Sequence, residues 1–274
     1  MDETAFAKIN LALHVRGRMT DGYHRIETVF AFAEHGDRIA VLESDDLELE
    51  VTGPFAAQLS GEADNIMLRA AHALREQHDV KRGARLILEK NLPVAAGLGG
   101  GSADAAATLR LLTRRWSLGL DERALLPIAT TLGADVPACL LGGLVRGDGR
   151  GDDLTLLDPE ETLLGKPMLL VNPGEYLPTD AVYRRWDGMD RGPLEDWRSG
   201  RNDLEPAAIG LVPEIADVLA ALGGAELARM SGSGATCFGL YSGEAQRDAA
   251  AAAISAAFPR WWIMATRLAS PPPL

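Results

Sequence analysis

The chain of 274 residues has only two cysteines and lacks any long apolar run. Cys139 and Cys237 show no Cys-x-x-Cys spacing, which argues against a zinc ribbon, a redox motif or a disulfide framework. The histidines form no His-Glu-x-x-His pattern, so the sequence gives little support for a transition-metal site built by the protein. No run of about 18 apolar residues is present, and the first residues lack the pattern of a signal peptide. We therefore expect a cytoplasmic protein.

Lysine is also scarce, because the 27 basic residues are mostly Arg and the lysines are Lys8, Lys81, Lys90 and Lys166; with 39 acidic residues the net charge is −12. Nucleic acids and anionic membranes bind clustered Lys and Arg, so we expect neither as a partner. The length suits one large domain or two smaller ones. The polar turn 147–153 is the best boundary, which predicts domains 1–155 and 156–274. The proline-rich end, 271–273, is predicted to be disordered.

One glycine-rich stretch follows the strand-like run 84–90 and precedes the helix-like run 103–115. It consists of Pro93, Val94, Ala95, Ala96, Gly97, Leu98, Gly99, Gly100, Gly101, Ser102 and Ala103. Glycines let a backbone turn sharply near a ligand, and a helix N-terminus carries about +0.5 charge. The stretch therefore predicts a phosphate site, with a plain chain reversal as the alternative.

Two common phosphate-loop motifs do not fit this stretch. No Gly-Lys-Ser/Thr closes it as in a Walker A motif, and Ser102 stands where a dinucleotide fingerprint needs Gly or Ala. We expect Ser102 to cap the following helix and the Asp104 side chain to face away from a bound phosphate.

The first strand, Ala5 to Arg16, alternates between apolar and polar residues. This spacing puts Lys8 and Asn10 on one face, about 7 Å apart. The alternative is that this polar face of the strand is simply exposed to solvent. Tyr23 to Phe30 reads as a second strand in a hairpin with the first, and its aromatic residues could either stack on a ring or pack in the core.

Further elements follow the spacing of apolar residues. We expect strands at 37–44 and 46–51, a helix from a cap at Asp64 to His78, and a helix 121–132 that Pro127 bends and Gly133 ends. Asp135 lies between that helix and a proline. It could cap the segment that it opens or act as a catalytic residue. The second half predicts an antiparallel sheet backed by helices. Its strands are expected at 168–172, 236–241 and 261–268, and its helices at 179–186, 214–222 and 244–258.

Five short motifs in order resemble a family of small-molecule kinases that includes galactokinase, homoserine kinase, mevalonate kinase and phosphomevalonate kinase. The resemblance runs from about Thr4 to Leu268. The motifs are 7–11, 21–24, 97–102, 132–137 and 231–234. It implies a two-domain α+β fold, with an N-terminal mixed sheet and helices that carry the glycine-rich phosphate loop. The C-terminal domain would be a ferredoxin-like antiparallel sheet with helices.

The resemblance also implies an ATP-dependent alcohol kinase with Lys8 and Asp135 as its catalytic pair. Asn10 would orient the hydroxyl, and Asn65 would contact the adenine. Residues 93–103 would hold the ATP phosphates, with Mg²⁺ carried by the nucleotide and no protein ligand assigned. Ala96 and Ala103 replace a frequent Gly and a frequent Ser of the family, which removes one hydroxyl near the phosphates.

The implied substrate is an alcohol that carries cytidine diphosphate, in the non-mevalonate route to isoprenoid precursors. Its cytosine would lie against Tyr23, His24, Phe30 and Tyr183, with Thr179 near the diphosphate. Three alternatives stay open: a homoserine-type or mevalonate-type kinase, a non-catalytic nucleotide-binding protein, and a nicotinamide dehydrogenase. A nicotinamide dehydrogenase would need a Gly-x-Gly-x-x-Gly motif, and the glycine-rich stretch lacks its third glycine. The sequence does not distinguish a monomer from a homodimer.

Overall fold

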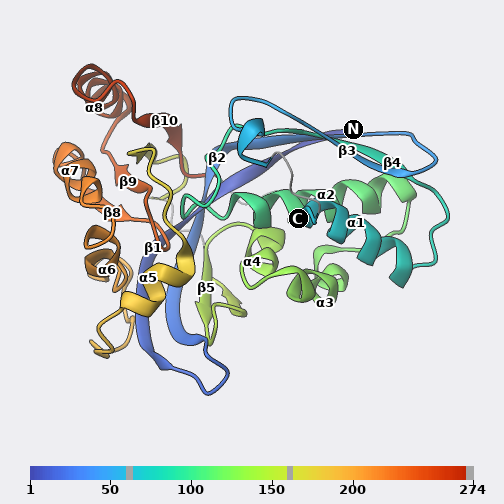
Figure 1. Cartoon of the computed structure of the whole chain (residues 1–274), viewed down its shortest axis with the longest axis horizontal. Coiled ribbons are helices and arrows are strands. Elements are labelled where there is room, and N and C mark those ends of the chain that lie inside the picture. The colour runs from blue at the N-terminus through green and yellow to red at the C-terminus, as the bar shows by residue number, and fades with distance from the viewer. Residues whose placement is uncertain (60–63, 159–162, 270–274) are drawn as a thin grey trace. The chain divides into compact units, whose positions relative to one another are not determined.

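The computed structural model describes residues 1–59, 64–158 and 163–269, and the predicted tail 271–273 lies outside them. Close contacts divide the chain into two compact units, each made of separated segments (Figure 1). The first unit comprises Met1–Ala7, His35–Val94 and Gly99–Leu141. The second unit comprises Lys8–Glu34, Ala95–Leu98 and Gly142–Leu274. The domain boundary between residues 155 and 156 stays a prediction.

Two long strands, β1 (Asp2–Arg18) and β2 (His24–Leu42), contribute residues to both units. They pair with each other, which confirms the predicted hairpin. The prediction of two strands in place of β2 was wrong, because residues 31–36 remain extended. A Cβ atom at Gly36 would lie 1.9 Å from the Ala5 carbonyl oxygen. The glycine thus lets the two strands stay close where the sequence suggested a break.

The larger sheet has the strand order β3-β4-β2-β5-β6 and is mixed, as predicted. In the first unit, β3 (Leu47–Thr52) runs parallel to β4 (Ala84–Glu89), and β4 pairs antiparallel with β2. In the second unit, β5 (Val145–Asp148) pairs antiparallel with β2 and with β6 (Asp153–Leu156). The sequence interpretation found only the turn of this last hairpin, because its strands are short and rich in Gly and Asp.

The helices of the first unit are η1 (Ala56–Leu59), α1 (Ile66–Gln77), α2 (Gly100–Trp116), α3 (Glu122–Leu132) and α4 (Val136–Leu141). Helices α1 to α4 are grouped together below strands β3 and β4 in Figure 1. Helix α2 packs against α1, α3 and α4 through a face rich in alanine. These small side chains allow the helices to approach one another closely.

Two predicted helix caps were wrong and one was right. Asn65, not Asp64, caps α1, because its Oδ1 accepts a hydrogen bond from the Met67 amide at 2.9 Å. Helix α2 begins at Gly100 after a left-handed Gly99, so Ser102 lies inside its first turn and caps nothing. Asp121 caps α3 as predicted, with its Oδ1 2.8 Å from the Ala124 amide nitrogen.

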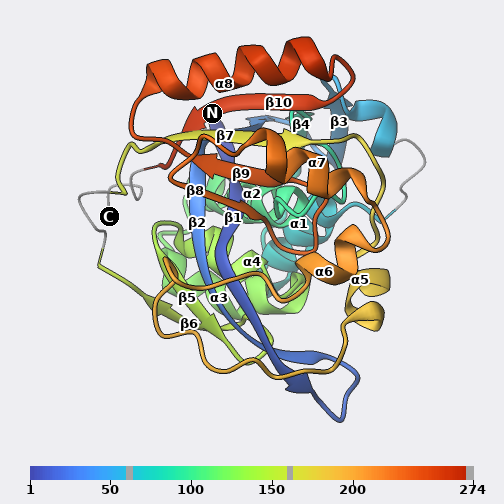
Figure 2. The same ribbon diagram turned by 90° about the vertical axis from the view of Figure 1, so that its left-hand side faces the viewer.

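A four-stranded antiparallel sheet of order β10-β7-β9-β8 organises the second unit and confirms the predicted arrangement. Its strands are β7 (Pro167–Asn172), β8 (Leu227–Met230), β9 (Cys237–Leu240) and β10 (Trp262–Arg267). Its helices are α5 (Thr179–Arg185), α6 (Glu205–Ile209), α7 (Glu214–Ala221) and α8 (Glu244–Ala257). Helices α7 and α8 pack on this sheet, and Figure 2 shows α8 running alongside β10.

Both cysteines are buried and neither forms a disulfide; Cys139 lies in the first unit and Cys237 in the second. Among the described residues, none of the helices has the length and apolar character that a bilayer crossing requires.

Candidate functional site

The glycine-rich stretch adopts backbone conformations that explain its composition. Ala95, Gly97 and Gly99 have φ values of 54°, 76° and 60°, in the left-handed region that favours glycine. A Cβ atom at Gly97 would also lie 2.4 Å from the Ser231 carbonyl oxygen. Any larger residue at position 97 would therefore displace the backbone.

The second glycine loop, 231–234, holds the middle of this stretch in place within the second unit. The Ser231 hydroxyl donates to the Gly97 carbonyl at 2.8 Å and accepts from the Asn10 amide at 3.2 Å. The Lys8 amide donates to the Leu98 carbonyl at 2.8 Å. Residues 95–98 are therefore bonded to β1 directly at Lys8 and, through the Ser231 hydroxyl, at Asn10.

Lys8 and Asn10 are buried, so the alternative of a solvated strand face was wrong. The Lys8 Nζ donates to the Asn10 Oδ1 at 3.0 Å and lies 4.7 Å from the centre of the Phe30 ring. The Asn10 Nδ2 donates to the Thr28 hydroxyl at 2.8 Å, and Thr28 donates to the Ala12 carbonyl at 2.7 Å. This chain of donors fixes the orientation of the Asn10 amide. Phe30 is 1% exposed and forms the apolar surface under the ammonium group.

Asp135 belongs to the first unit, where it is half-buried directly before α4. Its carbonyl oxygen accepts a hydrogen bond from the Cys139 amide at 3.0 Å, in the first turn of that helix. Lys8 belongs to the second unit.

Other predicted nucleotide-binding residues of the first unit lie at two helix N-termini. Asn65 is buried and uses its Oδ1 for the cap of α1. Gly100, Gly101 and Ser102 form the start of α2, where Gly101 is exposed and Ser102 half-buried. Their amide groups lie at the positive end of a 17-residue helix.

The aromatic residues predicted for the substrate separate into two groups in the second unit. The His24 ring lies 4.8 Å from the Tyr183 ring and 5.6 Å from the Trp186 ring, between centroids. Burial lowers the pKa of His24, and the positive charge of Arg18 lowers it further. Tyr23 is 56% exposed, and the Arg150 guanidinium lies 5.1 Å from its ring centroid.

Several neighbours of these residues were missed by the sequence interpretation. The hydroxyl groups of Thr179 and Ser233 form a hydrogen bond of 2.9 Å, which links the start of α5 to the second glycine loop. Trp186 had been assigned only to the end of a helix, and Arg150 only to a polar turn. No pattern in the sequence connects these positions with 23, 24 or 179.

A buried charge cluster in the first unit was also missed, and we call Asp37, Lys90 and Asp104 the ionic cluster. The Lys90 Nζ lies 2.5 Å from the Asp37 Oδ2 and 2.7 Å from the Asp104 Oδ2. Asp104 thus points into the protein interior. The two carboxylates raise the pKa of Lys90 although its burial opposes this.

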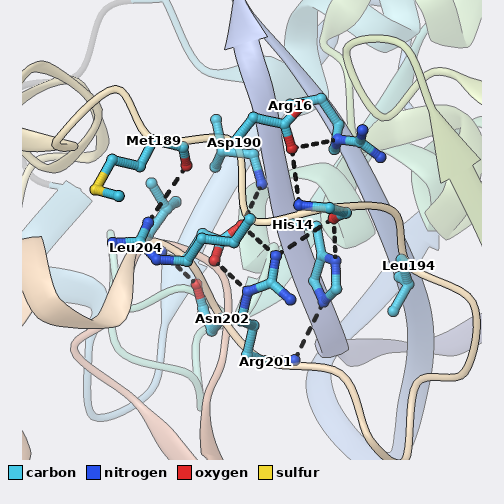
Figure 3. Close-up of polar contacts among 12 residues, drawn as sticks. His14, Arg16, Met189, Asp190, Leu194, Arg201, Asn202 and Leu204 are labelled. Atoms are coloured by element: carbon cyan, nitrogen blue, oxygen red, sulfur yellow. Dashed lines mark hydrogen bonds and ion pairs between the residues drawn. The ribbon is translucent and has the colours of Figure 1, made fainter.

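Figure 3 shows a second polar network, in which residues 187–204, here called the strap, are bonded to β1. The His14 Nδ1 lies 3.1 Å from the Gly192 carbonyl oxygen, and the Arg201 amide donates to the His14 Nε2 at 3.3 Å. The Val15 amide donates to the Asp203 Oδ2 at 2.8 Å. These partners require a neutral imidazole with its proton on Nδ1. Burial lowers the pKa of His14 accordingly.

The chain matches two family models, one in each half of the sequence. Residues 65–143 match the GHMP kinases N terminal domain, and residues 184–260 match the GHMP kinases C terminal domain. These matches agree with the α+β architecture of the two sheets.

Relatives of known name cover nearly the whole chain. A 4-diphosphocytidyl-2-C-methyl-D-erythritol kinase of Rhizorhabdus wittichii is 52% identical over 97% of this chain and 94% of that protein. The kinase of the same name from Sphingopyxis alaskensis is 48% identical over 98% of each chain.

Solved structures give the same result. The crystal structure of a 4-(cytidine 5'-diphospho)-2C-methyl-D-erythritol kinase has a TM-score of 0.80 and 37% identity, over 97% of this chain and 99% of that one. A homoserine kinase from Cytophaga hutchinsonii has a TM-score of 0.70 at 18% identity, with 96% of each chain covered, and shows a shared fold only. The chain therefore belongs to the GHMP kinases and, within them, to the 4-diphosphocytidyl-2-C-methyl-D-erythritol kinase family.

Proposed function

We propose that this chain transfers the γ-phosphoryl group of ATP to the 2-hydroxyl of 4-diphosphocytidyl-2-C-methyl-D-erythritol, in the non-mevalonate route to isoprenoid precursors. The observation that carries the proposal is the bonding of the glycine-rich stretch to the Lys8 and Asn10 positions of β1. A phosphate loop and a buried ammonium group are thereby parts of one hydrogen-bonded set. The high identity to kinases of this name supports the same reaction.

Asp135 is the general base and Lys8 is its partner in this proposal. An alcohol is a weak acid at neutral pH, so a carboxylate that takes its proton as the new P–O bond forms lowers the barrier. The Lys8 ammonium offsets the negative charge on the transferring phosphoryl group. Asn10, fixed by Thr28, orients the hydroxyl.

The glycine-rich stretch holds the ATP phosphates through backbone amides and the Ser102 hydroxyl. Alanine at positions 96 and 103 removes no amide group. Asn65 lies at the adenine side. We propose that Mg²⁺ enters with the nucleotide and supplies charge neutralisation on the phosphates. The described residues contain no cluster of three or more His, Cys, Asp or Glu side chains that could hold a metal ion.

The substrate is bound by residues of the second unit. We place its cytosine ring against Tyr23 and the pair of His24 and Tyr183, whose aromatic surfaces suit a flat ring. The linked hydroxyl groups of Thr179 and Ser233 lie at the diphosphate. Phe30 acts from beneath Lys8, where it shields the ammonium from water.

Substitution of the catalytic pair tests the reaction. Asp135→Asn and Lys8→Ala should each lower kcat by roughly 100-fold or more, while binding of ATP survives. Steady-state kinetics together with calorimetry of nucleotide binding measures both quantities. Asp45→Asn, the same change at an exposed position of the first unit, should keep the original kcat. Near-normal turnover of the Asp135 variant would overturn the assignment of the base.

Substrate identity is tested by the exposed ring of Tyr23. Tyr23→Ala should raise the KM for the cytidine alcohol by about tenfold and change the KM for ATP far less, since stacking on one ring contributes about 1–3 kcal/mol. An equal rise in both constants contradicts the stacking role. Turnover of homoserine or mevalonate in place of the cytidine alcohol would favour another kinase of the same fold.

A further inference from the structure

The ionic cluster contains one more negative charge than positive charge. Asp37 and Asp104 each approach the Lys90 Nζ, and the exposed fractions of the three side chains do not exceed 3%. Carboxylates in such a dry environment are stable only when they are paired or protonated. One ammonium group cannot fully compensate two ionised carboxylates.

The cluster is attached to both ends of the glycine-rich stretch. Directly before its start, the Asp37 Oδ1 accepts hydrogen bonds from the Asn91 and Leu92 amides at 2.6 and 2.8 Å. At its end, Asp104 lies on α2, five residues after the left-handed Gly99. A Cβ atom at Gly100 would lie 3.1 Å from the Lys90 Nζ, so the first residue of α2 rests on the cluster.

Asp104 is the member of the cluster that can gain a proton. Its Oδ2 is paired with Lys90, but its buried Oδ1 has no hydrogen-bond partner in the described structure. The charged groups that act on this carboxyl are Lys90, at the end of β4, and Asp37, from β2. Burial, reinforced by the charge of Asp37, raises the pKa of Asp104 to about 7 despite the opposing effect of Lys90.

We propose that Asp37, Lys90 and Asp104 are positioning residues for the phosphate-binding stretch, and that nucleotide binding increases the protonation of Asp104. The inference rests on the proposed function, which puts phosphates at the start of α2. A bound polyphosphate adds negative charge next to a cluster that already has an excess of it. Protonation of the Asp104 Oδ1 removes that excess while the Oδ2 keeps its contact with Lys90.

Calorimetry with a non-hydrolysable imido analogue of ATP, in the presence of Mg²⁺, tests this proton uptake. Titrations between pH 6 and pH 8.5 in two buffers of different ionisation enthalpy give the affinity and the number of protons bound. We expect the affinity of the original chain to fall by about tenfold over this range, the effect of a pKa shift of about one unit. Asp104→Asn, which mimics the protonated carboxyl, should lose this additional pH dependence and proton uptake.

Glu50→Gln is the matched control, because it removes one carboxylate of the first unit from an exposed pair with Arg85. It should keep the pH dependence of the original chain. Equal proton uptake by the original chain and by the Asp104 variant would overturn the inference. A chain that binds no analogue at any pH would instead overturn the proposed function.

The positioning role is tested by removing the cation. Lys90→Met leaves two uncompensated carboxylates and should weaken analogue binding at pH 8 by tenfold or more, with a smaller change in kcat. Adding Asp104→Asn to Lys90→Met removes one of these charges and should restore part of the affinity. Unchanged analogue binding by Lys90→Met, or no recovery of affinity in the double variant, would contradict the positioning role.

Discussion

The ionic cluster and the strap network are both buried polar systems, but their polar groups are paired in different ways. In the ionic cluster, three charges meet and the Asp104 Oδ1 is left without a partner. In the strap network, neutral His14 uses both ring nitrogens on backbone groups of residues 192 and 201. The first system can change its protonation without losing a contact that it already has, whereas the second loses one on protonation.

This difference separates the two roles. A group with spare hydrogen-bonding capacity and a pKa near neutrality is suited to respond to a ligand. A group whose donors and acceptors are all used is suited to hold one conformation. Removing charge from each system in turn tests whether the two networks differ in this way.

Loss of the cluster cation should have the largest effect on stability. Lys90→Met leaves Asp37 and Asp104 buried without a counter-charge, and breaking a buried pair in this way costs about 3–5 kcal/mol of unfolding free energy. Urea denaturation at pH 8 measures this loss, with Lys81→Met at an exposed position as the control. A loss below about 1 kcal/mol would show that water or a protonated carboxyl already compensates the charges.

Loss of the Asp203 carboxylate from the strap network should have a smaller effect. Asp203→Ala leaves the buried Val15 amide without its acceptor and removes the partner of the Arg201 guanidinium, which lies 2.6 Å away. An unsatisfied buried donor costs about 1–3 kcal/mol. Denaturation should show this loss for Asp203→Ala and none that is measurable for Asp190→Ala, which removes the exposed partner of Arg16. Equal losses in the two variants would contradict the importance of burial.

Protonation of His14 should have the smallest effect, and it should be local. Because its pKa is lowered in the folded chain, the stabilisation from neutral His14 is present above its unfolded value of about 6.5 and is lost as the pH falls below it. Hydrogen exchange of the Arg201 amide should therefore quicken severalfold, beyond the intrinsic pH effect, between pH 7 and pH 5.5. His14→Ala should show fast exchange at both pH values, and an unchanged rate would contradict the tautomer assigned here.

Periodic patterns predicted most elements of the fold. Alternation along residues 5–16 identified β1, and helical spacing with Asp121 and Gly133 located α3. The single strand β2 was missed because Gly36 suggests a break, and its need for glycine comes from the Ala5 carbonyl across the sheet. Residues 145–156 were missed as strands because their pairing, not their composition, keeps them extended.

Short motifs identified the candidate site, and the roles of its residues stay predictions. The glycine-rich stretch does contain left-handed glycines, and Lys8 and Asn10 are buried. The ionic cluster could not be found in this way, since 53 residues separate Asp37 from Lys90 and 14 separate Lys90 from Asp104. Only pairing of β2 with β4 and the packing of α2 bring these charges together.

The two cysteines allow local unfolding to be measured separately in each unit by alkylation of their thiol groups. Cys139 is buried in the first unit and Cys237 in the second, and burial raises the pKa of the Cys237 thiol. An alkylating reagent reacts with a thiolate that solvent can reach, so each sulfur becomes reactive only when its surroundings open. The order in which the two sulfurs acquire label, followed by mass spectrometry of peptides, thus ranks the opening of the two units without any added probe.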